Sequence, residues 1–100
     1  MSEVEKLRVV IFRDGDGWAA QCLEHDICAY ADDLGELQRR FEATFALECQ
    51  ISQEIHGEPL KGISPAPENF QRMWDECPGK YEPGSENKLS QRNIDFAMCA

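Results

Sequence analysis

Carboxylate side chains recur in the first third of the chain, where several of them together could bind a divalent cation. They are Asp14, Asp16, Glu24, Asp26, Asp32 and Asp33. A metal-dependent nuclease needs such groups to converge on Mg²⁺ or Mn²⁺ in octahedral oxygen geometry. The same positions suit structure: the first two fit a hairpin turn, Asp26 fits a second turn, and Asp33 fits a helix cap. We expect these structural roles and no catalytic metal, and we keep a residual nuclease using Asp14, Asp16, Glu24 or Asp26 as an alternative.

Cys22, His25 and Cys28 have a spacing that could offer three ligands to Zn²⁺. A closed structural zinc site needs a fourth ligand, and no further cluster of Cys or His follows. A nucleophilic Cys–His pair using His25 or His56 lacks an identifiable third residue to orient the histidine. The phosphate-binding glycine motifs and the HExxH zinc motif do not occur in the sequence. We therefore predict no catalytic residues, no metal ligands and no cofactor.

The cysteines are odd in number and irregular in spacing, which argues against a secreted disulfide framework. They are Cys22, Cys28, Cys49, Cys77 and Cys99. We expect reduced thiols that act mostly as small buried apolar groups. The first residues lack a basic region followed by an apolar run, and no stretch approaches the roughly 20 apolar residues of a membrane span. These observations predict a cytoplasmic protein without membrane contact.

The charge of the chain is strongly acidic. Asp and Glu total 19 against 10 Lys and Arg, so the formal net charge is -9. This field repels nucleic acid and anionic membranes and suits a small basic protein partner, although it also serves solubility alone. Basic residues are sparse: Arg39 and Arg40 form a local pair, and Arg8 and Arg13 are scattered. We expect no direct binding to nucleic acid.

Three short strands are expected at the start of the chain, over residues 7–13, 18–24 and 27–31. The first is rich in β-branched and aromatic side chains and ends at two Asp-Gly turn signals at 14–17, which favours a hairpin with the second. Together the three strands predict an antiparallel meander. Alternation places Leu7, Val9 and Ile11 on one face, and Arg8 on the other face with Val10 and Phe12. Both faces are then partly apolar, so each needs a cover.

A long helix is expected from Asp33, because Glu36 three residues later completes a capping-box pattern in which each side chain reaches the other's backbone. An apolar stripe follows at Leu34, Leu37, Phe41, Phe45 and Cys49. Gly57 and Pro59 end the helix.

The second half of the chain reads as a loop over 56–67 and a short helix from Pro67 to about residue 76, ended by Pro78 and Gly79. The short helix carries an apolar stripe that should pack on the domain: Phe70, Met73, Trp74 and Cys77. Residues 92–99 alternate like a strand that completes the sheet or pairs with another chain. The fold class is thus α+β in one domain over 1–100, with a core at 7–55, a loop and short helix at 56–78, and a connector and strand at 79–100.

Two runs, DGWAAQCLE at 16–24 and ADDLGEL at 31–37, in this order of strands and helix, resemble the HicB antitoxin family over about residues 7–55. The resemblance implies a partial RNase H-like fold without nuclease carboxylates. It also implies an antitoxin that occludes a small basic HicA-type RNase toxin, as part of a toxin–antitoxin system. Family members often carry a DNA-binding segment at the carboxyl end, and residues 78–100 are too short for a helix-turn-helix.

We therefore expect a protein-binding module, not an enzyme, that assembles as a homo-oligomer through an uncovered sheet face or edge. The acidic turns and their neighbours are the candidate partner-binding residues: Asp14, Asp16, Trp18, Glu24, His25 and Asp26. Besides the nuclease, a second alternative is a transcriptional regulator that binds DNA as a dimer through residues 92–99.

Overall fold

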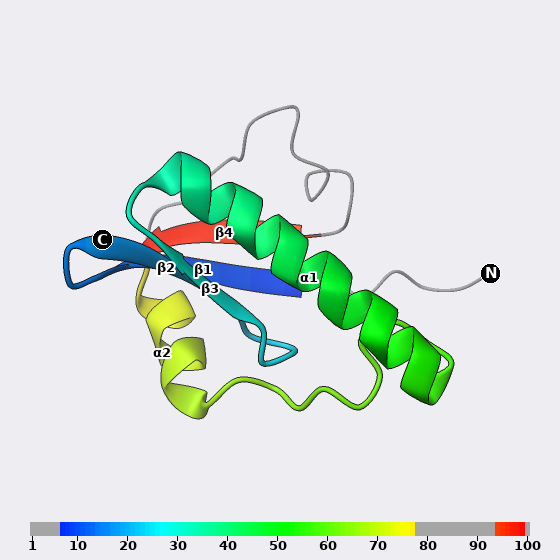
Figure 1. The fold of residues 1–100 in the computed structure, drawn as a ribbon. Helices are drawn as coiled ribbons and strands as arrows, with labels where there is room; N and C mark the ends of the chain where they lie inside the picture. The colour runs from blue at the N-terminus through cyan, green and yellow to red at the C-terminus, as the bar shows by residue number, and fades with distance from the viewer. Residues whose placement is uncertain (1–6, 78–93, 100) are drawn as a thin grey trace.

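A four-stranded mixed sheet separates two helices in the computed structural model, which describes residues 7–77 and 94–99 (Figure 1). The elements in chain order are β1 (Leu7–Asp14), β2 (Gly17–Cys22), β3 (Cys28–Ala31), α1 (Leu34–His56), α2 (Glu68–Glu76) and β4 (Ile94–Cys99). The predicted α+β class is confirmed. The predicted connector at 79–93, the helix stop at Pro78 and Gly79, and the first two residues of the predicted last strand lie outside the described residues.

The strands lie in the order β3-β2-β1-β4. β1 and β2 form an antiparallel hairpin whose turn begins at Gly15, with a positive φ of 64° that suits glycine at the first position of a two-residue turn. β3 continues antiparallel to β2. β4 runs parallel to β1, with Leu7 opposite Ile94 and Phe12 opposite Cys99. The strand near the end of the sequence therefore completes the sheet of its own chain, one of the two outcomes that the sequence left open.

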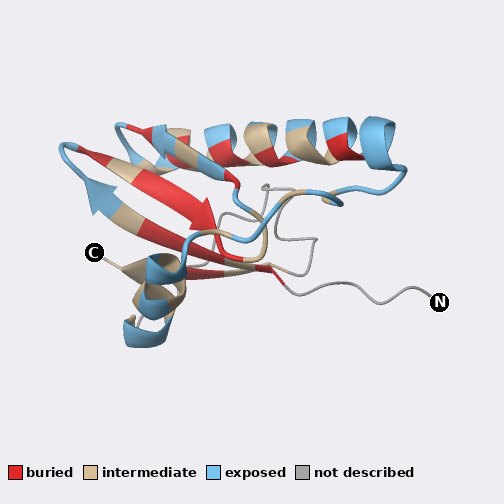
Figure 2. Ribbon diagram, turned by 90° about the horizontal axis from the view of Figure 1, so that it is seen from below, coloured by how far each residue is buried: buried red, intermediate tan, exposed pale blue. Residues whose placement is uncertain are grey.

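α1 covers one face of the sheet and forms the main core with it (Figure 2). Asp33 caps the helix by accepting a hydrogen bond from the Glu36 backbone N–H at 2.8 Å, and Gly57 ends it with a φ of 83°. The carboxylate of Glu36 contacts Arg39 at 3.2 Å, so the predicted return contact to the cap was wrong. The core joins residues of α1, the four strands and the turn before β3: Leu7, Val9, Ile11, Ala20, Cys22, Ile27, Ala31, Leu37, Phe41, Phe45 and Phe96. Neither described helix is long and apolar enough to cross a membrane.

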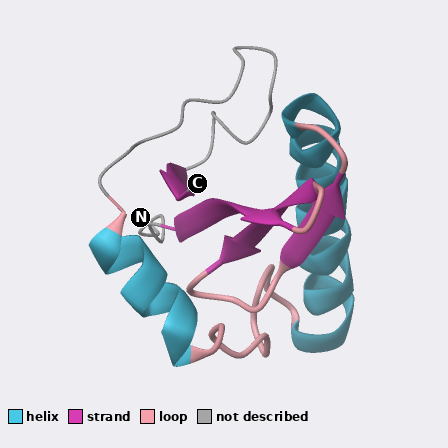
Figure 3. Cartoon of the chain, turned by 90° about the vertical axis from the view of Figure 1, so that its left-hand side faces the viewer, coloured by secondary structure: helices cyan, strands magenta, loops and turns pink. Residues whose placement is uncertain are grey.

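α2 lies on the opposite side of the sheet from α1 (Figure 3). The predicted alternation of β1 explains this arrangement, because Arg8, Val10 and Phe12 face away from α1. Phe12 meets Phe70 with ring centroids 5.9 Å apart, and the Arg8 guanidinium lies 5.8 Å from the centre of the Trp74 ring. No residue of α2 is fully buried. The short helix thus rests on the sheet through a few separate contacts.

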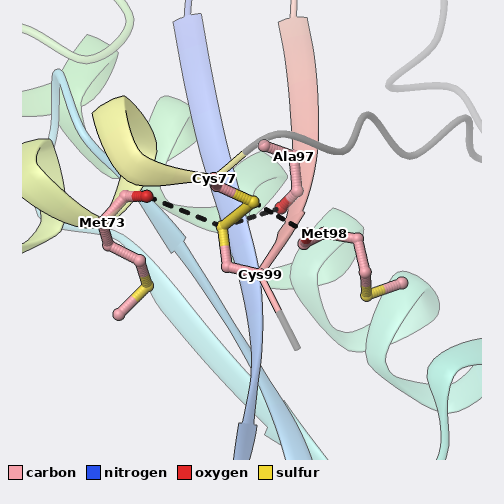
Figure 4. Close-up of a disulfide and its surroundings, with 5 residues drawn as sticks. All are labelled: Met73, Cys77, Ala97, Met98 and Cys99. Atoms are coloured by element: carbon pink, nitrogen blue, oxygen red, sulfur yellow. Dashed lines mark hydrogen bonds between the residues drawn. A yellow bond between two sulfur atoms is a disulfide. The ribbon is translucent and has the colours of Figure 1, made fainter.

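A disulfide between Cys77 and Cys99 joins the end of α2 to β4 (Figure 4). The expectation of five reduced thiols was therefore wrong for this pair. An odd, irregular set of cysteines argues against a framework of several disulfides, but a single bridge needs only two thiols that the fold brings together. Of the other three, Cys22 is buried as predicted, Cys49 is half-buried and Cys28 is exposed. Because disulfides persist mainly in oxidising compartments, the cysteines no longer support a cytoplasmic location.

Candidate functional site

The six predicted partner-binding residues fall into two groups at opposite ends of β2. Asp14 and Asp16 flank the start of the β1–β2 turn, and Trp18 follows in β2. Glu24, His25 and Asp26 come after β2 has ended at Cys22. A strand of six residues spans roughly 20 Å, so the two groups cannot contact one small ligand together. They are two separate surfaces.

The first group belongs to a larger acidic end of the sheet. Asp14 pairs with Gly17, and Trp18 pairs with Ala31 in the neighbouring strand. This register brings Asp32 and Asp33, which follow Ala31, to the same end as the hairpin turn. The aspartates gathered there are all exposed: Asp14, Asp16, Asp32 and Asp33. We call these four residues the acidic end.

Asp32 was absent from the predicted partner-binding residues, although the sequence contains the information that places it. In an antiparallel meander the start of the second strand and the end of the third strand lie at the same end of the sheet. Asp32 directly follows the third strand, so it had to lie near the Asp14–Asp16 turn.

Trp18 lies beside the acidic end on the face that α1 covers. It is half-buried and packs against the core. The guanidinium of Arg13 lies 4.8 Å from the centre of its ring, a cation–π contact between paired residues of β1 and β2. Trp18 therefore stabilises the hairpin from the side of the core, and the guanidinium of Arg13 already covers one face of its ring.

The second group attaches the loop after α1 to the sheet. Glu24 accepts hydrogen bonds from the Arg8 backbone N–H at 2.7 Å and from Arg8 Nε at 2.6 Å, and its side chain is only 18% exposed. Gln21 Nε2 donates to Asp26 Oδ1 at 2.9 Å, while the Asp26 backbone N–H donates to the carbonyl of Ser64 at 2.7 Å. Through these contacts Glu24 and Asp26 stabilise the fold: Glu24 binds β1, and Asp26 joins β2 to the loop after α1. Their role in partner binding stays a prediction.

His25 also points toward that loop, with Nδ1 3.2 Å from the carbonyl oxygen of Ile63. Ala66 donates its backbone N–H to the carbonyl of Leu23 at 3.0 Å, which extends the same attachment. An open pocket of about 530 Å³ lies beside it, between the end of β2, the loop and α2. Its lining is Arg8, Leu23, Glu24, Pro65, Ala66, Pro67, Glu68 and Gln71. Sequence reasoning missed this pocket because its walls come from segments that only tertiary contacts bring together.

The geometry also bears on the metal sites weighed from the sequence. Cys22 pairs with Val9, whose side chain faces α1, whereas Cys28 pairs with Gln21, whose side chain faces the other way. The two thiols therefore point to opposite faces of the sheet and cannot bind one zinc ion together with His25. Among residues 7–77 and 94–99, no group of three or more His, Cys, Asp or Glu side chains is arranged to hold a metal ion.

No protein-family model, no curated protein and no solved structure matches the chain.

Proposed function

We propose that this chain is a HicB-like protein-binding module that neutralises a small basic RNase of the HicA type by covering it. The acidic end carries the proposal. Four exposed aspartates lie there on one rim of the sheet, and the net charge of -9 extends the same field over the molecule. Opposite charge on a partner speeds encounter and favours the correct match over others.

The segment that supplies the acidic end is also the segment that carries the resemblance. The hairpin, β3 and the first turn of α1 follow one another as the HicB-like pattern implies, over residues 7–37. The carboxylates that a nuclease would need are divided between the two ends of β2, where Glu24 and Asp26 are held by Arg8 and Gln21. This distribution favours binding over residual metal-dependent cleavage.

The test is inhibition of a purified HicA-type RNase acting on a fluorescent RNA. We expect the full chain to suppress cleavage at equal molar amounts and to lose affinity as salt rises, because the charges are exposed. The variant Asp14→Asn, Asp16→Asn, Asp32→Asn should weaken inhibition by roughly tenfold to a hundredfold, since each exposed charge contributes modestly. Asp33 stays intact because it caps α1.

A matched control carries the same loss of charge away from the acidic end. The exposed residues Glu68, Asp75 and Glu76 of α2 can be changed to Gln, Asn and Gln together. If this control weakens inhibition as much as the aspartate variant, the site is wrong and only the net charge matters. If the wild type neither binds nor inhibits the RNase, the proposed function is wrong. RNA cleavage by the chain with Mn²⁺ would favour the nuclease, and a shift of its own promoter DNA would favour the regulator.

A further inference from the structure

One flank of α1 carries large apolar side chains in solvent. Leu47 is 55% exposed, Ile51 is 39% exposed and Ile55 is 68% exposed. Leu47 and Ile51 lie off the buried stripe of Phe41 and Phe45 that faces the sheet, whereas Ile55 comes about five full turns after the buried Leu37 and lies in line with that stripe near the end of α1. Figure 2 shows the side of α1 away from the sheet as largely exposed along its length. Two large apolar side chains exposed next to each other, Leu47 and Ile51, are not explained by solubility.

Residues on this flank form a pattern that is symmetric about Leu47. Ala43 and Ile51 lie four residues to either side, and Arg40 and Glu54 lie seven residues to either side. Positions separated by four or seven residues share one side of a helix, so these five residues form a single row. The spacing of the row is symmetric, but the two halves differ in charge and in side-chain size. Arg40 and the small Ala43 precede Leu47, whereas the large Ile51 and Glu54 follow it.

The geometry points to a second copy of this chain, docked through α1 in an antiparallel pair with the two-fold axis at Leu47. Turning the helix about that axis brings each residue opposite its symmetric counterpart. Leu47 then meets Leu47 of the other copy, Ala43 meets Ile51, and Arg40 meets Glu54. The small Ala43 leaves room for the large Ile51 of the other copy, and an ion pair between Arg40 and Glu54 lies at each end of the row.

The row lies on an accessible side of the domain. Arg40 donates a hydrogen bond to the carbonyl oxygen of Tyr30 in the edge strand β3 at 3.1 Å, so this flank of α1 lies at the β3 edge of the sheet. The Arg40 side chain remains 58% exposed, Ala43 and Glu54 are exposed, and the row stops where α1 ends at His56. The interface is therefore a helix flank, not the sheet face or edge that the sequence suggested for a homo-oligomer.

The first test is the mass of the protein in solution from about 1 µM to about 0.5 mM, by sedimentation equilibrium. One helix from each copy makes a small interface, so we expect a dimer with a dissociation constant in the micromolar range. Leu47→Glu should raise this constant by roughly a hundredfold or more, because it buries two carboxylates face to face. The matched control is Ala46→Glu, which adds the same charge at an exposed position on another side of the helix.

The second test is a charge exchange at the ends of the row. Arg40→Glu alone and Glu54→Arg alone each place like charges opposite one another at two symmetric places. We expect each to weaken the dimer by roughly tenfold, and the double variant to recover most of that loss. Arg40 also has two contacts within its own chain, with the Tyr30 carbonyl oxygen and with the Glu36 carboxylate at 3.8 Å. Any effect of losing these contacts would persist in the double variant, so recovery distinguishes the two causes.

The third test locates the axis by cross-linking in a Cys28→Ser background, which removes the exposed native thiol. With a mild oxidant, Leu47→Cys should form a disulfide between copies, because it meets itself on the axis. Ile51→Cys should not, since its two copies would lie about 12 Å apart along the helices. A wild-type monomer at about 0.5 mM, or cross-linking at position 51 and not at 47, overturns the proposal.

Discussion

The two faces of the sheet are covered in different ways. α1 has 23 residues and buries Leu37, Phe41 and Phe45 in a continuous core that reaches all four strands. α2 has nine residues and buries none of them fully. It contacts β1 through an aromatic pair and a cation–π contact, and the disulfide of Cys77, which follows its last residue, joins it to β4. The first face thus packs large side chains of α1 into a continuous core. The second face also buries sheet residues such as Val10 and Ala97, but α2 itself is attached to it through a few separable contacts.

This difference teaches that the domain has a stable layer and a dependent layer. Burial of large side chains in the α1 face provides the favourable term that holds a domain of this size together. The α2 face adds contacts that an experiment can remove one at a time. Damage to the first face should unfold the whole domain, and damage to the second should release α2 while the sheet and α1 remain.

The largest effect is expected from Phe41→Ala. Phe41 is 1% exposed and contacts Phe45 and Phe96, so its removal leaves a cavity in the middle of the core. We expect a loss of about 3–5 kcal/mol in the free energy of unfolding, measured by urea denaturation followed by circular dichroism. Phe70→Ala removes the same ring from the half-buried α2 face and should cost about 1–2 kcal/mol. Equal losses would contradict the division into two layers.

The next effect is expected from the disulfide. Replacing Cys77 and Cys99 by serine should lower the free energy of unfolding by about 3 kcal/mol, because the open chain gains conformational freedom when unfolded. Amide hydrogen exchange should speed up first in α2 and β4. A dithiol reductant should reproduce the loss in the wild type and leave the serine variant unchanged. Uniform acceleration across α1 as well would show that the two faces are not separable.

The smallest effect is expected from a single contact on the α1 side. Asp33→Ala removes the hydrogen bond to the Glu36 backbone N–H and should cost about 1 kcal/mol, or a fall of about 5 °C in the melting temperature. Asp33→Asn retains an acceptor and should lose less. Asp32→Ala is the neighbouring control, because Asp32 is exposed and does not cap the helix. If Asp33→Ala lowered the free energy of unfolding as much as Phe41→Ala does, α1 would depend on its cap as strongly as on its core packing.

Features fixed by neighbouring residues could be predicted from the sequence. The Asp-Gly turn, the Asp33 cap and the Gly57 stop each act over a few positions, and α1 begins and ends where they require. The alternation in β1 also predicted which side chains face each layer. Asp14 and Asp16 were placed at an exposed turn for the same local reason.

Features that depend on distant residues could not be predicted. The parallel pairing of β4 with β1 and the bridge from Cys77 to Cys99 require segments that meet only in the folded chain. The division of the candidate site into two ends, by contrast, follows from the predicted meander, in which the two turns lie at opposite ends of the second strand. The exposed row on α1 could not be predicted either, because which flank of the helix stays exposed depends on the sheet that it packs against.

The pairing of β4 with β1 has a consequence for the chain while it is being made. β1 is an inner strand of the finished sheet, yet its partner on one side comes from near the far end of the sequence. Until residues 94–99 leave the ribosome, the apolar segment at 9–12 has an open edge that can pair with any other extended chain. Nascent or truncated forms that lack β4 should therefore aggregate more readily than the chain that contains it.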